Sequence, residues 1–483
     1  MTRMARRPGS TYGNSGRGRL RIILWTILVA SLLSFGFRSR VDLIELAEFY
    51  AAQVFSARAR HNAAQVRIIR STRSSRNVCT NRNDPLNYVL GTGQSLSSGQ
   101  RSNPAIDTHN SAWPRWTFMT NVGIRQVPDA GALLPVDPTL IMGLLPIATA
   151  STSDGNGETI GATMTWTIND LLRTTNQAPY PVVFTTHGAI RRPYVALQRD
   201  SAPYDNALLT IARVSQLVFP RCVVVRALTV IHGEADSLGG TSQATYERDL
   251  LDWQRDFTVD LSSVTGQSSQ VLEFTDQMNS YTGPLMNPPR STSVIPLAQL
   301  QAAIDHPASV FLVGPKYFLE YTFDGVHLTA ASEQLLGEYY GKAYKQTVID
   351  GVPWKPLYPT AFVLSGRFIT VTFNVPVPPL VMDRTLVLDP GNAGFAYTED
   401  SNQPPSIVAV GLKAADQVLI RLSHAPNAAP GKRFLSYAWK GIPNNRAGPM
   451  TGPRGNLRDS DPVTGRYSGR RLFNWCVTFR RAF

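Results

Sequence analysis

The 483-residue sequence has few cysteines and lacks the common motifs for metals and nucleotides. Its three cysteines, Cys79, Cys222 and Cys476, form no CxxC pair and cannot make a zinc site on their own. Three cysteines are compatible either with one disulfide and one free thiol or with three buried thiols. HExxH and Walker-type glycine loops are also missing. We therefore expect no metal and no cofactor.

Excess charge is missing from most of the chain, although the net charge is +13. Residues 1–76 hold 14 Arg, no Lys and three acidic residues, a net of +11. The other 407 residues hold 33 basic and 31 acidic side chains, a net of +2. Polyanion binding needs a basic stripe on the folded surface. Nucleic acid is therefore not an expected partner.

Long hydrophobic runs are scarce as well, and the basic end contains the exception. Six Arg precede sixteen uncharged residues, Ile22–Phe37. This run is short for a spanning helix of about 20 residues but long enough for a signal peptide or signal anchor. No small-x-small cleavage site follows, which favours an uncleaved anchor over a cleaved signal; a buried helix is the alternative. We predict such a segment within residues 1–40, followed by a basic helical stalk and linker over residues 41–76.

The order of charge and hydropathy at this end also predicts a location. Arginines that precede an apolar run place the N-terminus inside and export the rest of the chain. We therefore expect an exported or membrane-anchored protein, periplasmic or extracellular, that contacts the membrane through its N-terminal apolar segment.

Residues 77–350 alternate between apolar runs and helical patterns. This alternation predicts a parallel sheet with helices on both faces, an α/β/α fold in which ligands bind beyond the carboxyl ends of the strands. The predicted strands begin at Asn87, Pro181, Cys222, Val271 and Val310, and the predicted helices at Glu158, Tyr204, Gln243 and Ala331.

Residues 351–483 have a different pattern. "FITVTFNV", from Phe368, and "QVLIRLS", from Gln417, alternate apolar and polar residues, as half-buried antiparallel strands do. We predict a small C-terminal β-sandwich without a catalytic constellation. Its Trp439 and Trp475 either line a sugar-binding face or, as we favour, pack inside.

Polar residues follow the predicted strands. Ser95 follows the first strand, and Asp324 and His327 precede the last helix. Acyl transfer needs a nucleophile, a base, a group that orients the base, and donors for the oxyanion. The carboxylate of an Asp three residues before a His can accept a hydrogen bond from one ring nitrogen, while the other ring nitrogen contacts the serine. These three residues therefore predict a Ser-His-Asp site.

The segments "GTGQSLSSG", "IHGEAD" and "DGVHLTAAS" occur in this order and resemble the SGNH hydrolase superfamily, in particular its sialate O-acetylesterase and acetylxylan-esterase-like branch. The resemblance covers residues 85–347. It implies a five-stranded flavodoxin-like sheet, with Ser95 as nucleophile, His327 as general base and Asp324 as its orienter. The N–H groups of Ser95 and Gly188 would then hold the oxyanion.

Two positions in the "IHGEAD" segment complicate the comparison. His232 stands where the family usually has Gln, and its imidazole N–H is a candidate third oxyanion donor. Glu234 is either a second orienter of the base or a structural residue that accepts backbone N–H groups.

The sequence thus predicts a serine esterase that removes acyl groups, mainly O-acetyl, from a carbohydrate. Two alternatives stay open. One is a non-catalytic glycan-binding or virion or surface structural protein. The other is a lipolytic or thioesterase activity on the same three residues.

Overall fold

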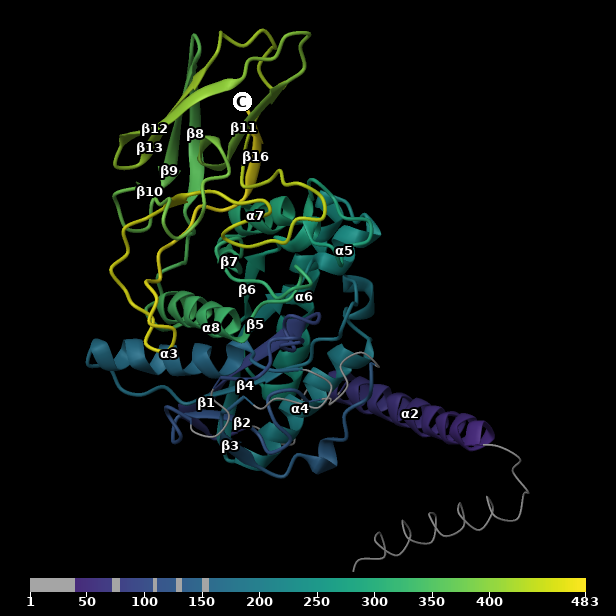
Figure 1. Ribbon diagram of the computed structural model, residues 1–483. Coiled ribbons are helices and arrows are strands. Elements are labelled where there is room, and N and C mark those ends of the chain that lie inside the picture. Colours follow the sequence, from purple (N-terminus) through teal and green to yellow (C-terminus); the bar gives the residue numbers. More distant parts are fainter. Residues whose placement is uncertain (1–39, 72–78, 107–110, 127–132, 150–155) are drawn as a thin grey trace, which may run out of the picture. The chain divides into compact units, whose positions relative to one another are not determined.

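The computed structural model describes residues 40–71, 79–106, 111–126, 133–149 and 156–483 (Figure 1). The chain forms two compact units, Met1–Arg60 and His61–Phe483. Helix α2 (Arg40–Ser71) covers most of the predicted stalk. The predicted signal segment Ile22–Phe37 lies outside the described residues. Within the described ranges, no helix is both long and apolar enough to cross a membrane.

A seven-stranded sheet forms the centre of the α/β part, in the order β3-β2-β4-β1-β5-β6-β7. The five predicted strands pair in parallel in the order β4-β1-β5-β6-β7, which is the flavodoxin-like order. The strands are β1 (Asn81–Gly93), β2 (Thr117–Thr120), β3 (Leu144–Pro146), β4 (Val182–Thr186), β5 (Arg221–Ile231), β6 (Leu272–Gln277) and β7 (Val310–Pro315).

Two edge strands extend this predicted core. β2 runs parallel to β4, and β3 pairs antiparallel with β2. The sequence did not predict them because three or four residues are too few to show an alternation. The sheet is therefore mixed and larger than the five strands that the resemblance implied, while the predicted α/β/α fold class is confirmed.

Helices cover both faces of the sheet (Figure 1). α3 (Ile160–Thr174) and α8 (Ala330–Tyr344) pack together on one face. α4 (Ala202–Val218), α6 (Gln243–Thr265) and α7 (Ile295–Asp305) cover the other. A π-helical turn, Lys345–Ile349, continues α8. Helix α6 shows why these segments are helical, because its buried residues Tyr246, Leu250, Trp253, Phe257 and Leu261 recur every three or four positions.

The C-terminal region is built from antiparallel strands, as the alternation predicted. In β9, Ile369, Val371 and Phe373 are buried while Thr370 and Thr372 are partly exposed. One sheet has the order β12-β13-β9-β8 and another β11-β14-β16, and side chains of both share one core. The strands are β8 (Tyr358–Ser365), β9 (Phe368–Asn374), β10 (Val381–Met382), β11 (Phe395–Glu399), β12 (Ile407–Ala414), β13 (Gln417–Leu422), β14 (Arg433–Tyr437), β15 (Leu457–Arg458) and β16 (Phe479–Ala482).

Both C-terminal tryptophans pack against other parts of the chain. Trp475 is buried, and its ring stacks on Phe318 with the centroids 5.5 Å apart. Trp439 is partly buried, and its Nε1 donates to the carbonyl of Ser293 at 2.7 Å. The favoured packing role agrees with these contacts.

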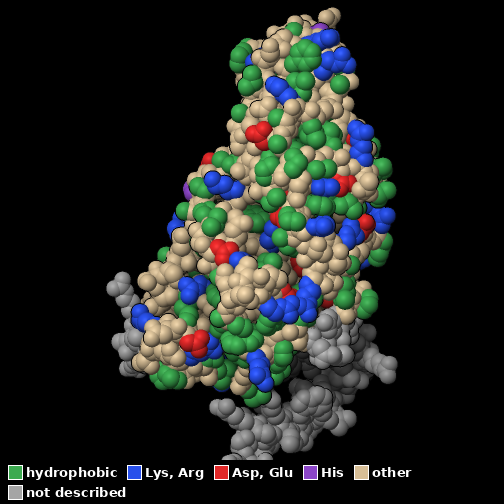
Figure 2. All heavy atoms as spheres, turned by 90° about the vertical axis from the view of Figure 1, so that its left-hand side faces the viewer, with side chains coloured by type: hydrophobic (Ala, Val, Ile, Leu, Met, Phe, Trp, Pro, Cys, Tyr) green, Lys and Arg blue, Asp and Glu red, His purple; other side chains and the backbone are tan. Residues whose placement is uncertain are grey.

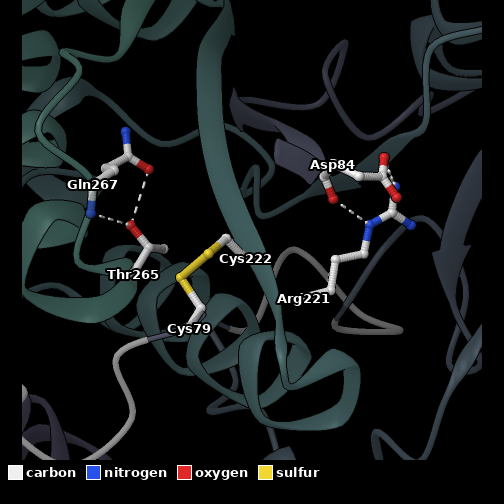
Figure 3. The surroundings of a disulfide bond; sticks show 6 residues. All are labelled: Cys79, Asp84, Arg221, Cys222, Thr265 and Gln267. Carbon is white, nitrogen blue, oxygen red and sulfur yellow. Dashed lines mark hydrogen bonds and ion pairs between the residues drawn. A yellow bond between two sulfur atoms is a disulfide. The ribbon is translucent and has the colours of Figure 1, made fainter. Parts of the chain in front are cut away.

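Of the two possibilities for the cysteines, the structure has one disulfide and one free thiol. Cys79, just before β1, is bonded to Cys222 in β5, and Cys476 is buried and free. Beside the disulfide, Arg221 donates to the carbonyl and the carboxylate of Asp84, each at 2.8 Å (Figure 3). The amino-terminal ends of β1 and β5 are therefore joined by a covalent bond and by polar bonds.

Figure 2 shows the charged side chains on one face of the described part of the chain. On the face shown in Figure 2, basic side chains are scattered among acidic and uncharged ones. This face carries no broad basic stripe of the kind that nucleic acid binding requires.

Candidate active site

The turn that carries Ser95 begins where β1 ends. Gly93 has a φ of +129°, and a Cβ there would lie 2.2 Å from the carbonyl oxygen of Ile231. Only glycine fits this position. The carbonyl of Ser95 then accepts the N–H groups of Ser98 at 3.2 Å and Gln100 at 3.0 Å, which closes the turn. Ser95 is thus held at the carboxyl end of a buried strand, with 3% of its surface exposed.

The loop between β7 and α8 brings the other two predicted residues to Ser95. The Oγ of Ser95 lies 2.8 Å from Nε2 of His327, although the two residues are 232 positions apart. The Nδ1 of His327 lies 2.8 Å from Oδ2 of Asp324. Both distances are normal for hydrogen bonds. Serine, imidazole and carboxylate therefore form one continuous hydrogen-bonded chain.

Asp324 is held in a fixed orientation by its own loop. Its Oδ1 accepts the hydroxyl of Thr322 at 2.9 Å and the N–H groups of Val326 at 2.9 Å and His327 at 3.0 Å. Burial raises the pKa of Asp324, but the bonds from the His327 ring and these amides outweigh it and hold the pKa well below its usual range. The group is therefore a carboxylate and fixes the proton on Nδ1 of His327.

Arg101 and Phe323 complete the surroundings of Asp324, and the sequence did not indicate either. The Nε of Arg101 lies 3.3 Å from Oδ2 of Asp324, and its guanidinium lies over the ring of Phe323, 5.2 Å from the centroid. Phe323 is 76% exposed. Because Arg101 lies in a polar loop without periodicity, no sequence pattern distinguished it from a solvated arginine.

Gly188 lies directly against the Ser95 turn. A Cβ on Gly188 would lie 1.9 Å from Oγ of Ser97 and 3.0 Å from the carbonyl oxygen of Gly93. Within the described residues, neither the N–H of Gly188 nor that of Ser95 donates to a protein acceptor. Both predicted oxyanion donors are therefore unoccupied and lie on adjoining backbone segments.

His232 has a different environment. Its Nδ1 lies 2.9 Å from the hydroxyl of Tyr246, and its Nε2 lies 2.9 Å from the carbonyl oxygen of Arg192. Its side chain is fully buried and packs edge-on against Trp253. With a partner on each ring nitrogen, His232 has no spare N–H for a substrate, and we do not propose it as an oxyanion donor.

Glu234, the candidate second orienter, belongs to a buried ionic network. Its Oε1 accepts the hydroxyl of Ser280 at 3.1 Å and lies 3.7 Å from Nζ of Lys316. The same ammonium lies 2.7 Å from Oδ1 of Asp276. These contacts favour the structural role of Glu234. The sequence did not single out Lys316, because a lysine after a strand has no distinguishing pattern.

The remaining polar groups near the strand ends have local roles. His187 bonds to Thr185 at 3.2 Å, and burial lowers the pKa of His187 to about 3, so its ring stays neutral. Asp236 accepts the N–H of Tyr194 at 3.0 Å. Throughout the described ranges, no group of three or more His, Cys, Asp or Glu side chains is placed to hold a metal ion.

No protein-family model matches the chain, and no curated protein matches it. Several solved structures are similar to the chain. A carbohydrate acetylesterase from Xanthomonas citri is 12% identical, with a TM-score of 0.49, over 82% of this chain and 80% of that chain. A carbohydrate acetylesterase from Sinorhizobium meliloti is 12% identical, with a TM-score of 0.30, over 55% and 99%. A tail fiber protein from an E. coli phage is 13% identical, with a TM-score of 0.28, over 65% and 36%.

Because the identities and TM-scores are low, the fold and the candidate site are assigned from the strand order and the contacts of this chain.

Proposed function

We propose that this protein is a serine esterase that removes acyl groups, mainly O-acetyl, from a carbohydrate. The observation that carries the proposal is the buried hydrogen-bonded chain from Ser95 through His327 to Asp324, with 2.8 Å at each link. A buried serine with a purely structural role needs only one hydrogen-bond acceptor. Acyl transfer requires in addition an imidazole in a fixed orientation and a carboxylate bonded to it.

The proposed reaction proceeds in two steps. The Oγ of Ser95 attacks the acyl carbon while Nε2 of His327 takes its proton, and the N–H groups of Ser95 and Gly188 bind the oxyanion. The ester C–O bond breaks, and the sugar hydroxyl leaves with the proton from His327. Water then attacks the acyl-Ser95 ester while Nε2 of His327 takes its proton; the bond from the acyl carbon to Oγ of Ser95 breaks, the carboxylic acid is released, and Oγ receives the proton from His327. Asp324 remains ionised and stabilises the imidazolium in both steps.

The substrate class rests on the sequence resemblance and on two exposed side chains beside Asp324. Phe323 offers an exposed aromatic face beside Asp324, and the adjoining Arg101 offers a partly exposed guanidinium. An aromatic face can pack against the C–H groups of a sugar ring, and guanidinium N–H groups can donate to sugar oxygens. These two side chains suit a carbohydrate that carries the ester.

We also propose that the protein acts outside the cytoplasm. The Cys79–Cys222 disulfide supports this proposal, because structural disulfides persist in oxidising compartments. The arginine-rich start followed by Ile22–Phe37 supports it independently.

Hydrolysis of p-nitrophenyl acetate by the full-length protein tests the activity. Ser95→Ala and His327→Ala should each lower kcat/KM by about 10⁴-fold or more, and Asp324→Asn by about 10³- to 10⁴-fold. Ser268→Ala and His306→Ala, the same residue types away from the site, are matched controls that should keep wild-type rates. Circular dichroism checks that every variant folds.

Other outcomes would favour the alternatives. A folded wild-type protein that hydrolyses no ester but binds glycans would contradict the esterase proposal and support a binding role. Rates that rise steadily with acyl chain length would instead support a lipolytic or thioesterase activity.

A further inference from the structure

A polar cleft with a volume of about 690 Å³ lies at the same edge of the sheet as the proposed active site. One wall is α5 (Glu234–Gly239) and the turn that follows it, directly after β5. The opposite wall is the segment 290–294, which follows β6 and precedes α7. Because β1, β5 and β6 are parallel, both walls and Ser95 lie beyond the carboxyl ends of their strands.

The C-terminal region fixes the shape of the cleft. The hydroxyls of Ser237 and Ser293, one from each wall, lie 2.9 Å apart. The carbonyl of Ser293 also accepts Nε1 of Trp439 at 2.7 Å, and the carbonyl of Ser291 accepts the N–H of Gly441 at 2.9 Å. Segment 290–294 is thus bonded on both sides, so the cleft is preformed.

The chemistry of the lining selects the ligand. Most of the lining residues carry a hydroxyl or an amide group, and the others are Gly240, Arg290 with its guanidinium and Val294 with an exposed side chain; none of the described lining residues is acidic. Arg290 donates to the carbonyl of Leu238 at 3.1 Å, which leaves further N–H groups for a ligand. Among the described residues, the side chains of Thr292 and Gln243 have no protein hydrogen-bond partner. Such a surface suits a hydroxyl-rich ligand rather than an acyl chain.

Helix α5 connects the cleft to the nucleophile turn. The N–H of Ala235, in the first turn of α5, donates to Oε1 of Gln94 at 3.1 Å, next to Ser95. Six residues of helix span about 9 Å; the first turn of α5 contacts Gln94, and its second half carries Ser237, which lines the cleft. A saccharide chain that follows α5 would reach both Ser95 and the cleft.

We propose that this cleft binds a second, neighbouring unit of the saccharide whose acyl group is removed at Ser95. This subsite rests on the proposed function and makes the protein an esterase of oligosaccharides or polysaccharides rather than of single sugars. Cleft volumes of about 300–1,000 Å³ are typical of ligand sites, and 690 Å³ falls in that range.

The test compares acetylated monosaccharides with tetrasaccharides in the full-length protein. The probes are chemically acetylated xylo-, cello- and malto-sugars, each as monomer and tetramer, together with p-nitrophenyl acetate. For at least one series, the wild-type KM should be about tenfold lower for the tetramer, because two or so added hydrogen bonds give such a factor. Thr292→Trp, which fills the cleft, should remove this difference and leave p-nitrophenyl acetate hydrolysis unchanged.

Two further variants keep the result interpretable. Gln243→Ala removes an unpartnered amide without adding bulk and should raise the tetramer KM by a smaller factor. Ser268→Trp places the same bulk in a cleft of about 250 Å³ at the opposite edge of the sheet and should change nothing.

The results separate the two proposals. If the wild type hydrolyses no ester, the proposed function fails. If it hydrolyses esters but shows no tetramer preference in any series, or if Thr292→Trp retains that preference, only the subsite is overturned.

Discussion

At the scale of single residues, the contact between Gly188 and the Ser95 turn links the two proposed oxyanion donors. The hydrogen bond from the Ser98 hydroxyl to the carbonyl of Gly188, at 3.3 Å, and the bond from the N–H of Ala189 to the carbonyl of Gly93, at 3.0 Å, hold the two segments together. With no side chain on Gly188, the backbones can approach closely. The separation of the donors therefore depends on this one glycine.

Gly188→Ala should lower kcat/KM on p-nitrophenyl acetate by about 10²-fold or more, the loss typical of a displaced oxyanion donor. The reason is the 1.9 Å approach of the new Cβ to Oγ of Ser97, which forces one segment to move. Ser97→Gly alone should retain most activity, and in combination with Gly188→Ala it should restore part of the loss. Equal activities of Gly188→Ala and the wild type would show that this N–H does not bind the oxyanion.

How far single residues can be predicted depends on whether they belong to a local motif. Ser95, Asp324 and His327 stand in short segments whose spacing has a chemical meaning, and the structure brings them together. Arg101 contacts Asp324, and Lys316 contacts Glu234 and Asp276, through tertiary contacts alone, so the sequence carried no signal for either. For His232, the sequence could not show that Tyr246 and the Arg192 carbonyl occupy both ring nitrogens.

At the scale of elements, the strands and helices with long patterns were predictable, and the short ones were not. β1, β4, β5, β6 and β7 are buried apolar runs, and α3, α4, α6 and α8 have helical periodicity; all were predicted. The edge strands β2 and β3 have three or four residues, and α5 has six. Helix α7 (Ile295–Asp305) was missed because its sequence is largely apolar and shows little polar periodicity.

Helix α6 supplies a pH-dependent contribution to stability through Asp249. This carboxyl is 7% exposed. Burial and then the charge of Asp236 raise its pKa to about 6, against a smaller opposite effect of Arg248. Because the folded-state pKa exceeds the ordinary value of about 3.9, the stability it contributes is complete below about pH 4 and is lost as pH rises through about 6.

Asp249→Asn should therefore raise the free energy of unfolding above that of the wild type at about pH 8. The difference between variant and wild type should be about 1–2 kcal/mol more favourable to the variant at about pH 8 than at about pH 4. Urea unfolding at the two pH values measures the difference. An equal effect of the substitution at both pH values would contradict the raised pKa.

At the scale of the whole molecule, the C-terminal region is bonded to the α/β part at many points. Gln277 and Thr478 exchange two hydrogen bonds, at 2.7 and 2.9 Å, and Lys342 lies 2.6 Å from Asp461. The hydroxyl of Tyr281 donates to the carbonyl of Trp439 at 2.6 Å. The boundary near residue 350 stays a prediction from composition, and the return of this region onto the catalytic part was not visible in any local pattern.

The Cys79–Cys222 disulfide should stabilise the whole fold. It closes a loop across 143 positions, and such a bond restricts the unfolded chain, so Cys79→Ser combined with Cys222→Ser should lower the free energy of unfolding by about 2–4 kcal/mol. Reductant should destabilise the wild type but not this variant. In denaturant without reductant, thiol titration should detect one thiol, that of Cys476; three thiols would show that the disulfide is absent.

The central claim is that Ser95 carries the acyl group during the reaction. Mass spectrometry of the full-length protein, quenched in acid during turnover of p-nitrophenyl acetate and digested, measures this directly. We predict one added acetyl group on the peptide that contains Ser95 in the wild type and none there in Ser95→Ala. An acetyl group on another residue, or ester hydrolysis that persists in Ser95→Ala, would contradict the claim.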